Sequence, residues 1–567
     1  MLLLYFRTIK NLTLKQFIFR IVYIFKRKWI ERFSATVTRK YYDQAKKRYN
    51  ELTLDANLLI YHRQYYRSDL ANVLLNKITF LNHTIDFGDA IGWNAEQLNH
   101  GTRLWKLNLH YHEFLVDVAH VAQQDNGQPY YDYLLHTIND WIDHNPIGTP
   151  GYGQDNWNSY ALSLRIVAWI KIFALLGERF NPEFKRRFIV SLLAQVYFLR
   201  DNIEFDILGN HLFKNWKALE FASKFFNIDD FSVYAYKLYK SHLSGQMTKA
   251  CIHQELSPMY TGIVLEDIAE VMQLTDHYQL IKPQILAGYK NLCYLINDDQ
   301  YSFFNDSVNA NEVTPAQLEQ LFKQIFGDIE QSQGAFNVDG YVGYKDGSEH
   351  LIVDLAPVVL GSQGGHVQCD ALSLEWFVNN TKILTNSGVY EYNVGDRRTY
   401  SRSTRAHNTV AIEAYEQSEV WGAFRLGRSA TTKLLFSSHS ASEFQCEGQV
   451  QYYYHKRPLC HKRTVKHQPG LLVINDNLFN SNDTSYNKAM AYFHFHPQFV
   501  MQHQSANQIV LANTVGMNVE LLSEDNIKVE QTPFFDQFGR EEQKITVMIS
   551  GFRSNRIIST RISITHE

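Results

Sequence analysis

The spacing of apolar residues changes once, a little past the middle of the chain. Before that point they recur at positions i, i+3 and i+4, as in Tyr160–Leu176, Phe188–Leu199 and Leu265–Leu274, which places them on one face of a helix. The loops between these helical stretches are rich in Gly, Pro and Asn, as in Asn145–Asn156. The pattern predicts paired helices wound into a toroid or a solenoid, with the last helix at Thr314–Phe326. No fixed-period repeat decides between the two.

The second part of the chain has the residue pattern of β-strands. Its apolar segments are short, rich in β-branched and aromatic residues, and bounded by Gly, Asn or Asp: YVGYKDG, HLIVDLAPVVL, TKILTNSGVY, NTVAIEAY, GLLVIND and AMAYFHFHP. Few stretches with helical spacing follow residue 327, so we expect an antiparallel β-sandwich. The predicted organisation is a helical N-terminal segment at 1–44, an (α/α) toroid at 45–327 and a β-sandwich at 328–567.

The N-terminal segment combines apolar and basic residues at helical spacing. From Met1 to Lys40 the chain has ten Lys or Arg against one acid, Glu31. The charges interrupt every apolar run, so neither a secretory signal nor a membrane span is predicted, and we expect a cytoplasmic protein or one at the inner membrane face. One interpretation is a basic amphipathic helix that brings residues 1–40 to an anionic membrane. The other is a helix packed on the next domain with a solvated basic face.

Composition narrows the class of protein. At 567 residues the chain needs two or more domains. The net charge of −3 gives no sign of a nucleic-acid partner. Five scattered cysteines without a CxxC exclude a disulfide framework and a thiolate zinc site, and they suit a reducing compartment. Aromatic residues make up 14% of the chain, which suits both sugar stacking and a large aromatic core.

Four polar residues lie near the expected starts of helices or strands, where their side chains could project into a cleft. Asn210 and His211 open a helical run, although a helix cap and a surface histidine are the alternatives. Tyr260 follows Pro258 near an expected helix start, with a core tyrosine as the alternative. His366 follows two glycines at an expected strand start.

A dense set of arginines comes next in the chain. Its members are Arg397, Arg398, Arg402 and Arg405. Guanidinium groups bind carboxylate and sulfate in a bidentate manner, which favours an anionic sugar as partner. Acidic residues lie close by in the sequence, so a charged loop in solvent is the alternative.

Together and in this order, these motifs resemble the heparinase II/III family of polysaccharide lyases, most closely its alginate lyase-like branch. The matching stretches are Leu104–Leu115, Asn156–Lys171, Gly209–Ala222, Glu255–Tyr260, Gly364–Trp376, Ser387–Tyr392 and Arg402–Arg428. The resemblance implies an (α/α) toroid followed by an antiparallel β-sandwich. It also implies β-elimination on an anionic, uronic-acid-containing polysaccharide.

The resemblance also implies roles for individual residues. Asn210 corresponds to the family's carboxylate-neutralising asparagine and His211 to its neighbour, while Tyr260 and His366 correspond to the catalytic tyrosine and the base-type histidine. Which of these two is the base stays open, although Tyr260 is the expected acid. A tyrosine base would need a pKa lowered by cations such as the arginines. The arginines and three further residues, His407, Tyr392 and Trp421, are expected to bind substrate.

The sequence departs from the family at the positions of its structural metal. Relatives that bind the metal use a histidine and an acid where this chain has Gln368 and Asn386, together with a histidine that matches His407. Neutral amides are poor zinc ligands. We therefore predict no zinc and no other cofactor.

Three functions remain open at this point. The first is a lyase that acts on a uronate polymer, linked to capsule or exopolysaccharide metabolism. The second is a glycan-binding or assembly protein on a lyase scaffold, suggested by the lost ligand positions. The third is a glycoside hydrolase, for which Glu255, Glu266 and Asp267 are the acids close to a motif.

Overall fold

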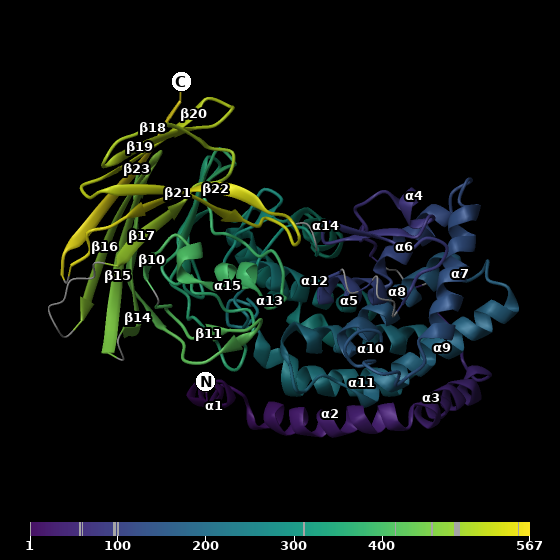
Figure 1. Ribbon diagram of the computed structural model, residues 1–567. Coiled ribbons are helices and arrows are strands. Elements are labelled where there is room, and N and C mark those ends of the chain that lie inside the picture. The colour runs from purple at the N-terminus through teal and green to yellow at the C-terminus, as the bar shows by residue number, and fades with distance from the viewer. Residues whose placement is uncertain are drawn as a thin grey trace.

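The computed structural model contains a helical lobe and a sheet lobe that lie side by side (Figure 1). It describes residues 2–566 except 56–57, 59–60, 94–97, 99–100, 310–311, 414, 441, 455–456, 481–487 and 554. The predicted fold class, a helical toroid followed by an antiparallel β-sandwich, is confirmed.

Three helices form the N-terminal segment: α1 (Leu2–Lys10), α2 (Leu14–Arg32) and α3 (Ser34–Tyr49). A capping box between Thr13 and Gln16 fixes the start of α2. In Figure 1, α1 and α2 run along one side of the molecule, with α1 below the sheet lobe and α2 below the helical lobe. The Asn11 amide donates to the carbonyls of Leu426 and Gly427 and so ties this segment to the sheet lobe.

The helical lobe is a toroid of paired helices. They are α4 (Leu70–Val73), α5 (Arg103–Tyr111), α6 (Glu113–Ala122), α7 (Gln128–His144), α8 (Ser159–Leu176), α9 (Pro182–Asp201), α10 (Gly209–Phe226), α11 (Asp229–Leu238), α12 (Pro258–Leu274), α13 (Lys282–Leu292) and α14 (Pro315–Phe326). Two hairpins, β1 (Lys77–Phe80) with β2 (His83–Asp86) and β3 (Ile296–Asn297) with β4 (Gln300–Tyr301), join them. Sequential packing of α6, α8, α10 and α12 gives the lobe its core.

Helix α8 lies at the centre of this core. By length and composition it is the one described helix that would cross a membrane, but 83% of it is buried inside the protein, as expected for a core helix. Its apolar residues are buried on nearly every side, which a helix tolerates when neighbours surround it. Helices α10 and α12, whose N-terminal turns hold candidate residues, follow in the same packed series.

The sheet lobe holds three antiparallel sheets of four or more strands among its described residues. One is built from β5 (Gly334–Val338), β6 (Tyr341–Lys345), β7 (Glu349–Asp354), β8 (Leu374–Val378) and β9 (Thr381–Leu384) in that order. The largest runs in the order β13 (Thr431–His439), β14 (Phe444–Tyr454), β15 (Arg457–Gln468), β16 (Leu471–Asn480), β23 (Ile557–His566), β20 (Met517–Ser523), β19 (Gln508–Ala512), β18 (Val500–Gln504). The third runs β10 (Val410–Ile412), β17 (Ala489–His494), β22 (Glu542–Ile549), β21 (Ile527–Phe534).

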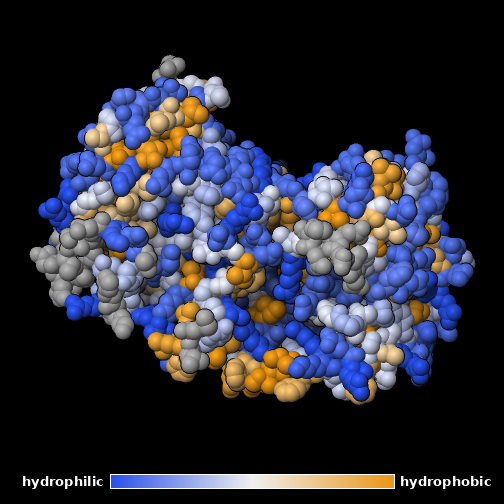
Figure 2. Space-filling view, viewed as in Figure 1, coloured by the Kyte–Doolittle hydropathy of each residue, from blue (hydrophilic) through white to orange (hydrophobic). Residues whose placement is uncertain are grey.

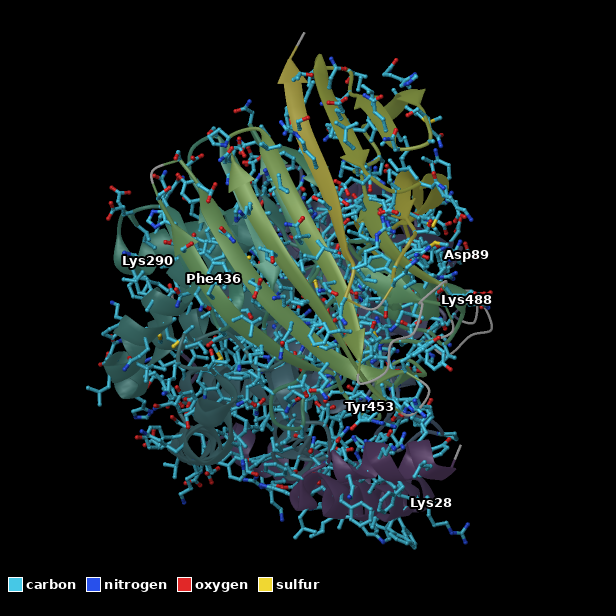
Figure 3. The ribbon with its side chains drawn as sticks, turned by 90° about the vertical axis from the view of Figure 1, so that its left-hand side faces the viewer. Lys28, Asp89, Lys290, Phe436, Tyr453 and Lys488 are labelled. Carbon is cyan, nitrogen blue, oxygen red and sulfur yellow. The ribbon has the colours of Figure 1, made fainter. Side chains whose placement is uncertain are left out.

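A common core holds these sheets together. Trp376, Val450, Ile474, Phe493 and Val547 come from all three sheets and are fully buried in one apolar cluster. Burial alternates along β14, as expected for a strand with one face on the core. Figure 3 looks onto the large sheet, with Phe436 on β13 and Tyr453 on β14.

Two small elements complete the sheet lobe beside the helical lobe. The short helix α15 (Asp396–Arg402) follows β9, and the hairpin β11 (Val420–Trp421) with β12 (Arg425–Leu426) follows β10. The sequence analysis expected a loop or a strand for the α15 segment. Two of its arginines, Arg398 and Arg402, are buried and hydrogen-bonded, so tertiary contacts hold this short polar segment as a helix.

Candidate active site

Asn210 and His211 occupy the first turn of α10. The N-cap residue of α10 is Leu208, which has a positive φ of 65° and makes no side-chain hydrogen bond to the helix. Asn210 lies inside the first turn, so the interpretation of Asn210 as the helix cap is wrong. Gly209 also has a positive φ, and a Cβ there would collide with the Glu255 carboxylate. Asn210 is buried, and its Oδ1 has no hydrogen-bond partner among the described residues. A buried amide without a protein partner calls for an explanation, and a substrate group is one.

His211 forms an ion pair with a carboxylate that the sequence analysis did not single out. Its Nδ1 lies 3.2 Å from Oε1 of Glu204, and its ring packs against Tyr160 with 4.4 Å between ring centroids. Burial opposes a charge on the imidazole, but the Glu204 carboxylate outweighs it, and the pKa of His211 is raised above its usual value. The structure therefore places beside Asn210 an imidazole whose cationic form is favoured by a carboxylate.

Tyr260 lies in the first turn of α12. Ser257 caps this helix by accepting a hydrogen bond from the Tyr260 backbone N–H at 3.2 Å, and Pro258 occupies the first helical position. The Tyr260 hydroxyl lies 2.9 Å from that of Tyr392. Burial, and then Tyr392, raise the pKa of Tyr260 well above its usual value. The phenol therefore stays protonated, and the lowered pKa that a tyrosine base would need is not found.

His366 lies in the loop between β7 and β8, not at a strand start as expected. Its Nδ1 is 2.9 Å from Oδ2 of Asp306, and the Asp306 backbone N–H donates to the His366 carbonyl at 3.1 Å. The imidazole ring lies over the Tyr260 ring with 4.1 Å between centroids. A carboxylate that accepts from Nδ1–H fixes the tautomer in which Nε2 is free to accept a proton.

Asp306 connects the site to the sheet lobe. Arg398 donates to both of its carboxylate oxygens, at 2.6 and 2.7 Å, and the Gln368 amide donates to Oδ1 at 2.8 Å. Burial alone would raise the pKa of Asp306, but Arg398 and His366 hold it well below its usual range. Sequence reasoning missed Asp306 because it lies 60 residues from His366 and 92 from Arg398, within no motif.

Aromatic side chains from three segments surround His366. The rings of Tyr392 and Phe424 lie 5.8 and 5.7 Å from the imidazole and 5.1 Å from each other. Phe424 lies on the β11–β12 hairpin and is 43% exposed. Such rings offer flat apolar faces on which sugar rings stack. Phe424 falls within the matching stretch Arg402–Arg428, but no local pattern distinguishes it from its neighbours.

Two family models together match most of the chain. The model described as Heparinase II/III N-terminus matches residues 18–331, and the one described as Heparinase II/III-like, C-terminal, matches residues 330–563. The chain belongs to the heparinase II/III family. The protein is therefore a polysaccharide lyase by family. None of the curated proteins compared with the chain matches it.

Solved structures with this fold include other polysaccharide lyases. A crystal structure of heparinase III has a TM-score of 0.72 at 18% identity, and the match covers 92% of this chain and 85% of that one. A mutant heparan sulfate lyase from Pedobacter heparinus has a TM-score of 0.62 at 14% identity, covering 95% and 89%. A chondroitin AC lyase from Streptomyces coelicolor A3, in complex with chondroitin sulphate, has a TM-score of 0.52 at 9% identity, covering 93% and 83%. At these identities the likeness concerns the fold.

The arginines of this heparinase II/III protein do not form one substrate-binding set, as the sequence analysis expected. Arg398 and Arg402 are buried. Arg402 donates to the backbone carbonyls of Val367, Trp421 and residues 422–423, so it braces the His366 loop against the β11–β12 hairpin. Arg397 pairs with Glu541 at the surface, and Arg405 is exposed. The predicted substrate-binding role fails for Arg398 and Arg402, because both are enclosed by protein partners.

His407 and Trp421 are also held by the protein. His407 is fully buried, and burial lowers its pKa to about 3, so the ring is neutral and out of reach of a polysaccharide. The Trp421 indole N–H donates to the Thr8 hydroxyl at 3.0 Å, and its ring contacts Tyr5 of α1 at 4.7 Å. Trp421 therefore anchors the N-terminal segment, while Tyr392 lies beside Tyr260 as a substrate-binding residue would.

The donors at the family's metal positions do not fit zinc. Both ring nitrogens of His407 lie 3.2 Å from oxygens of Asn386 and Ser401, and Gln368 is hydrogen-bonded to Asp306. Among the described residues, no group of three His, Cys, Asp or Glu side chains is placed to hold a metal ion. Zinc prefers imidazole, thiolate and carboxylate ligands. That the protein works without zinc stays a prediction.

Proposed function

We propose that the chain cleaves a uronate-containing polysaccharide by β-elimination at the site of Asn210, His211, Tyr260 and His366. The observation that carries this proposal is the contact between His366 and Tyr260. A histidine oriented by Asp306 lies against a tyrosine whose pKa is raised. The first is suited to accept a proton and the second to donate one.

At the sugar ring, the proposed reaction breaks two σ bonds and forms one π bond, while one proton passes to His366 and another leaves Tyr260. Nε2 of His366 takes the proton from C5 of the uronate, and the electron pair of the C5–H bond forms a C4–C5 double bond. The C4–O4 bond breaks at the same time, and the Tyr260 hydroxyl gives its proton to the leaving O4. A base and an acid on separate residues fit the geometry, because Tyr260 is protonated and His366 is the residue bound to a carboxylate.

The charge that develops on the substrate needs neutralisation. Removal of the C5 proton drives negative charge onto the uronate carboxylate, and preorganised donors that face it lower the barrier. Asn210 and the cationic His211 are adjacent in one helical turn. In addition, anions are stabilised near the N-terminus of a helix, where both residues lie. We assign the carboxylate of the substrate to this turn of α10.

For the substrate we propose a glycosaminoglycan or a similar acidic polymer. Two of the solved structures with this fold are a heparan sulfate lyase and a chondroitin AC lyase in complex with chondroitin sulphate. The Tyr392 and Phe424 rings beside His366 would stack on the sugars. We place the activity in capsule or exopolysaccharide metabolism, inside the cell or at the inner membrane face. Cell fractionation, and glycosyltransferase genes next to this one, would support that placement.

Hydrolysis is disfavoured by the state of the acids near the motif. Glu266 pairs with Arg63 at 2.8 Å, and Asp267 pairs with Lys214 at 2.8 Å. Burial would raise the pKa of Glu255, but His253 and His366 lower it to about 2. A glycosidase needs one carboxyl group protonated as general acid. None of these three acids is suited to that role.

Products from a panel of uronate polymers test the proposal. Heparan sulfate, chondroitin sulfate, hyaluronan, alginate and a neutral glucan serve as substrates, and products are analysed by ultraviolet absorbance and by mass. We expect, on a uronate polymer, an absorbing product that is lighter by one water than the hydrolysis product. Reducing ends without absorbance would show a hydrolase. Tight binding of the same polymers without product would show a glycan-binding protein, and either result would overturn the proposal.

A further inference from the structure

Helix α2 turns its polar side toward the protein. Four of its side chains, from Gln16, Arg20, Tyr23 and Lys26, donate hydrogen bonds to backbone carbonyls of residues 201–207 in the loop after α9. Ile30, farther along the same helix, is buried against Gly148. The segment therefore packs on the toroid, and it does so with part of the basic face that the sequence analysis expected in solvent.

The apolar side of α1 and α2 consequently faces outward. We call it the outer apolar face, and it consists of Leu3, Phe6, Ile9, Leu14, Phe17, Ile18, Ile21, Val22, Ile24, Phe25 and Trp29, with Phe33 directly after α2. Each of these side chains is between 42% and 75% exposed. Figure 2 shows the resulting hydrophobic patch along the lower edge of the molecule, where Figure 1 places α1 and α2. A contiguous patch of this kind marks an interaction surface.

The charges along this face are positive. Lys10, Lys28 and Arg32 are exposed and have no ion-pair partner in the part of the chain that the structure describes. On a helical projection Lys28 and Arg32 fall within the arc of Ile21 and Phe25, and Figure 3 shows Lys28 at the outer edge of the N-terminal helices. Glu31 is the single acid among the first 40 residues. An apolar face that also carries unpaired cations complements anionic lipid.

A second copy of the chain fits this face less well. A two-fold contact brings the same patch of both copies together, so Lys28 and Arg32 of both copies would be enclosed in one interface, where Glu31 is the single acid that the segment supplies. Like charges in such an interface cost free energy. A lipid surface satisfies both features at once, since acyl chains accept the apolar residues while anionic headgroups pair with the cations.

We propose that the outer apolar face of α1 and α2 lies flat on an anionic lipid bilayer. The helices lie along the membrane plane and do not cross it, because basic residues interrupt both of them. The catalytic lobes are then held against the lipid surface through the bonds between α2 and the 201–207 loop and between Asn11 and β12. This inference does not rest on the proposed lyase activity.

Vesicle flotation with the full chain tests the proposal. The probes are vesicles of phosphatidylcholine alone and of phosphatidylcholine mixed with phosphatidylglycerol. The first variant, Ile21→Gln with Phe25→Gln, removes apolar area from the outer face. Its matched control, Val500→Gln with Val515→Gln, changes side chains that are 58% and 75% exposed on the sheet lobe. The second variant, Lys28→Glu with Arg32→Glu, reverses charge. All substituted side chains are exposed, so the fold should survive.

We expect the wild type and the control to float with the mixed vesicles. The apolar variant should bind at least about a hundredfold more weakly, since two large side chains no longer enter the lipid. The charge variant should bind on the order of thirtyfold or more weakly, since each basic residue near an anionic surface contributes to binding. Failure of the wild type to float, or equal binding by all three variants, would overturn the proposal. A lipid-free dimer that dissociates in the apolar variant would overturn it too, in favour of a second copy.

Discussion

At the scale of single residues, the site is organised around one buried carboxylate. Asp306 accepts hydrogen bonds from His366, Arg398 and Gln368, and so it ties the expected base to a buried cation. Its negative charge fixes the tautomer of His366 and also balances Arg398. The same group therefore supports catalysis and folding, and a substitution should affect both.

We expect Asp306→Asn to lower kcat by about a hundredfold or more, because His366 loses the partner that orients it as a base. Unfolding free energy should fall by about 3–5 kcal/mol, because Arg398 is left as an uncompensated buried charge. The lowered pKa of Asp306 means that its contribution is present above the unfolded-state pKa and is lost as the pH falls through the folded value. The stability difference between wild type and variant should therefore shrink in acid.

Asp476 provides the matched control for this prediction. It holds His461 and Arg463 in a similar buried His–Asp–Arg cluster in the large sheet, at 2.7 to 2.8 Å. Asp476→Asn should cost comparable stability and leave kcat of the folded protein unchanged. Equal loss of kcat in both variants would show that Asp306 acts through stability alone.

The pair of His211 and Glu204 should set the high-pH limb of activity. Glu204 favours the charged imidazole of His211, and this ion pair stabilises the folded protein. The stabilisation is complete below the pKa that His211 has in the unfolded chain, and it is lost as the pH rises through the raised pKa in the folded protein. In Glu204→Gln this pKa falls, and the high-pH limb of kcat/KM should move to lower pH. Glu220→Gln is the control, because the Glu220 carboxylate accepts hydrogen bonds from Tyr278 and Ser232 and not from His211. This variant should leave the pH profile of kcat/KM unchanged. An unmoved limb in Glu204→Gln would remove His211 from the mechanism.

The sequence predicted part of this site for a physical reason. Tyr260 and Asn210 follow helix starts, and a helix start projects its side chains in a direction that local sequence reveals. Asp306, Glu204 and Phe424 join the site through contacts made only in the folded chain, so no local pattern marks them. The opposite error occurred with Arg402 and His407, which are close to site residues in sequence but enclosed by protein in space.

At the scale of secondary-structure elements, buried ion pairs link the helices of the toroid. Lys214 and Lys217 of α10 pair with Asp267 of α12 at 2.8 and 2.9 Å, and Lys171 of α8 pairs with Glu270 of α12 at 2.6 Å. All five side chains are buried. These pairs fix the relative rotation of the helices whose first turns hold Asn210 and Tyr260. Apolar periodicity predicted the helices themselves, but it does not reveal which helices share charges.

We expect Lys217→Met to destabilise the fold by about 3–5 kcal/mol, because it removes one cation from a buried pair and leaves the acids undercompensated. The urea unfolding midpoint measures this change. Lys323→Met is the control, since Lys323 pairs with Glu319 on the exposed side of α14 and its loss should leave the midpoint in place. A Lys217→Met protein as stable as wild type would mean that the network adds specificity and not stability.

At the scale of the whole molecule, the site depends on both lobes. Tyr260 and Asp306 come from the helical part of the chain, and Tyr392, Arg398 and the His366 loop come from the sheet part. The change in apolar periodicity predicted both lobes and their order along the chain. It did not predict how they meet, because that junction forms between residues far apart in the chain, with Tyr341, Ile352 and Phe538 of the sheet lobe packed into the core cluster of the helices. Nor did it predict that α1 and α2 would turn their apolar side outward.

The central claim is that His366 and Tyr260 act as base and acid of a β-elimination, and initial rates of ultraviolet absorbance test it most directly. With the uronate polymer that the wild type cleaves, His366→Ala and Tyr260→Phe should each lower the rate by about 10²–10⁴-fold. Tyr131→Phe, whose hydroxyl bonds Arg179 at the surface, should match the wild type. Wild-type rates in both His366→Ala and Tyr260→Phe would contradict the account.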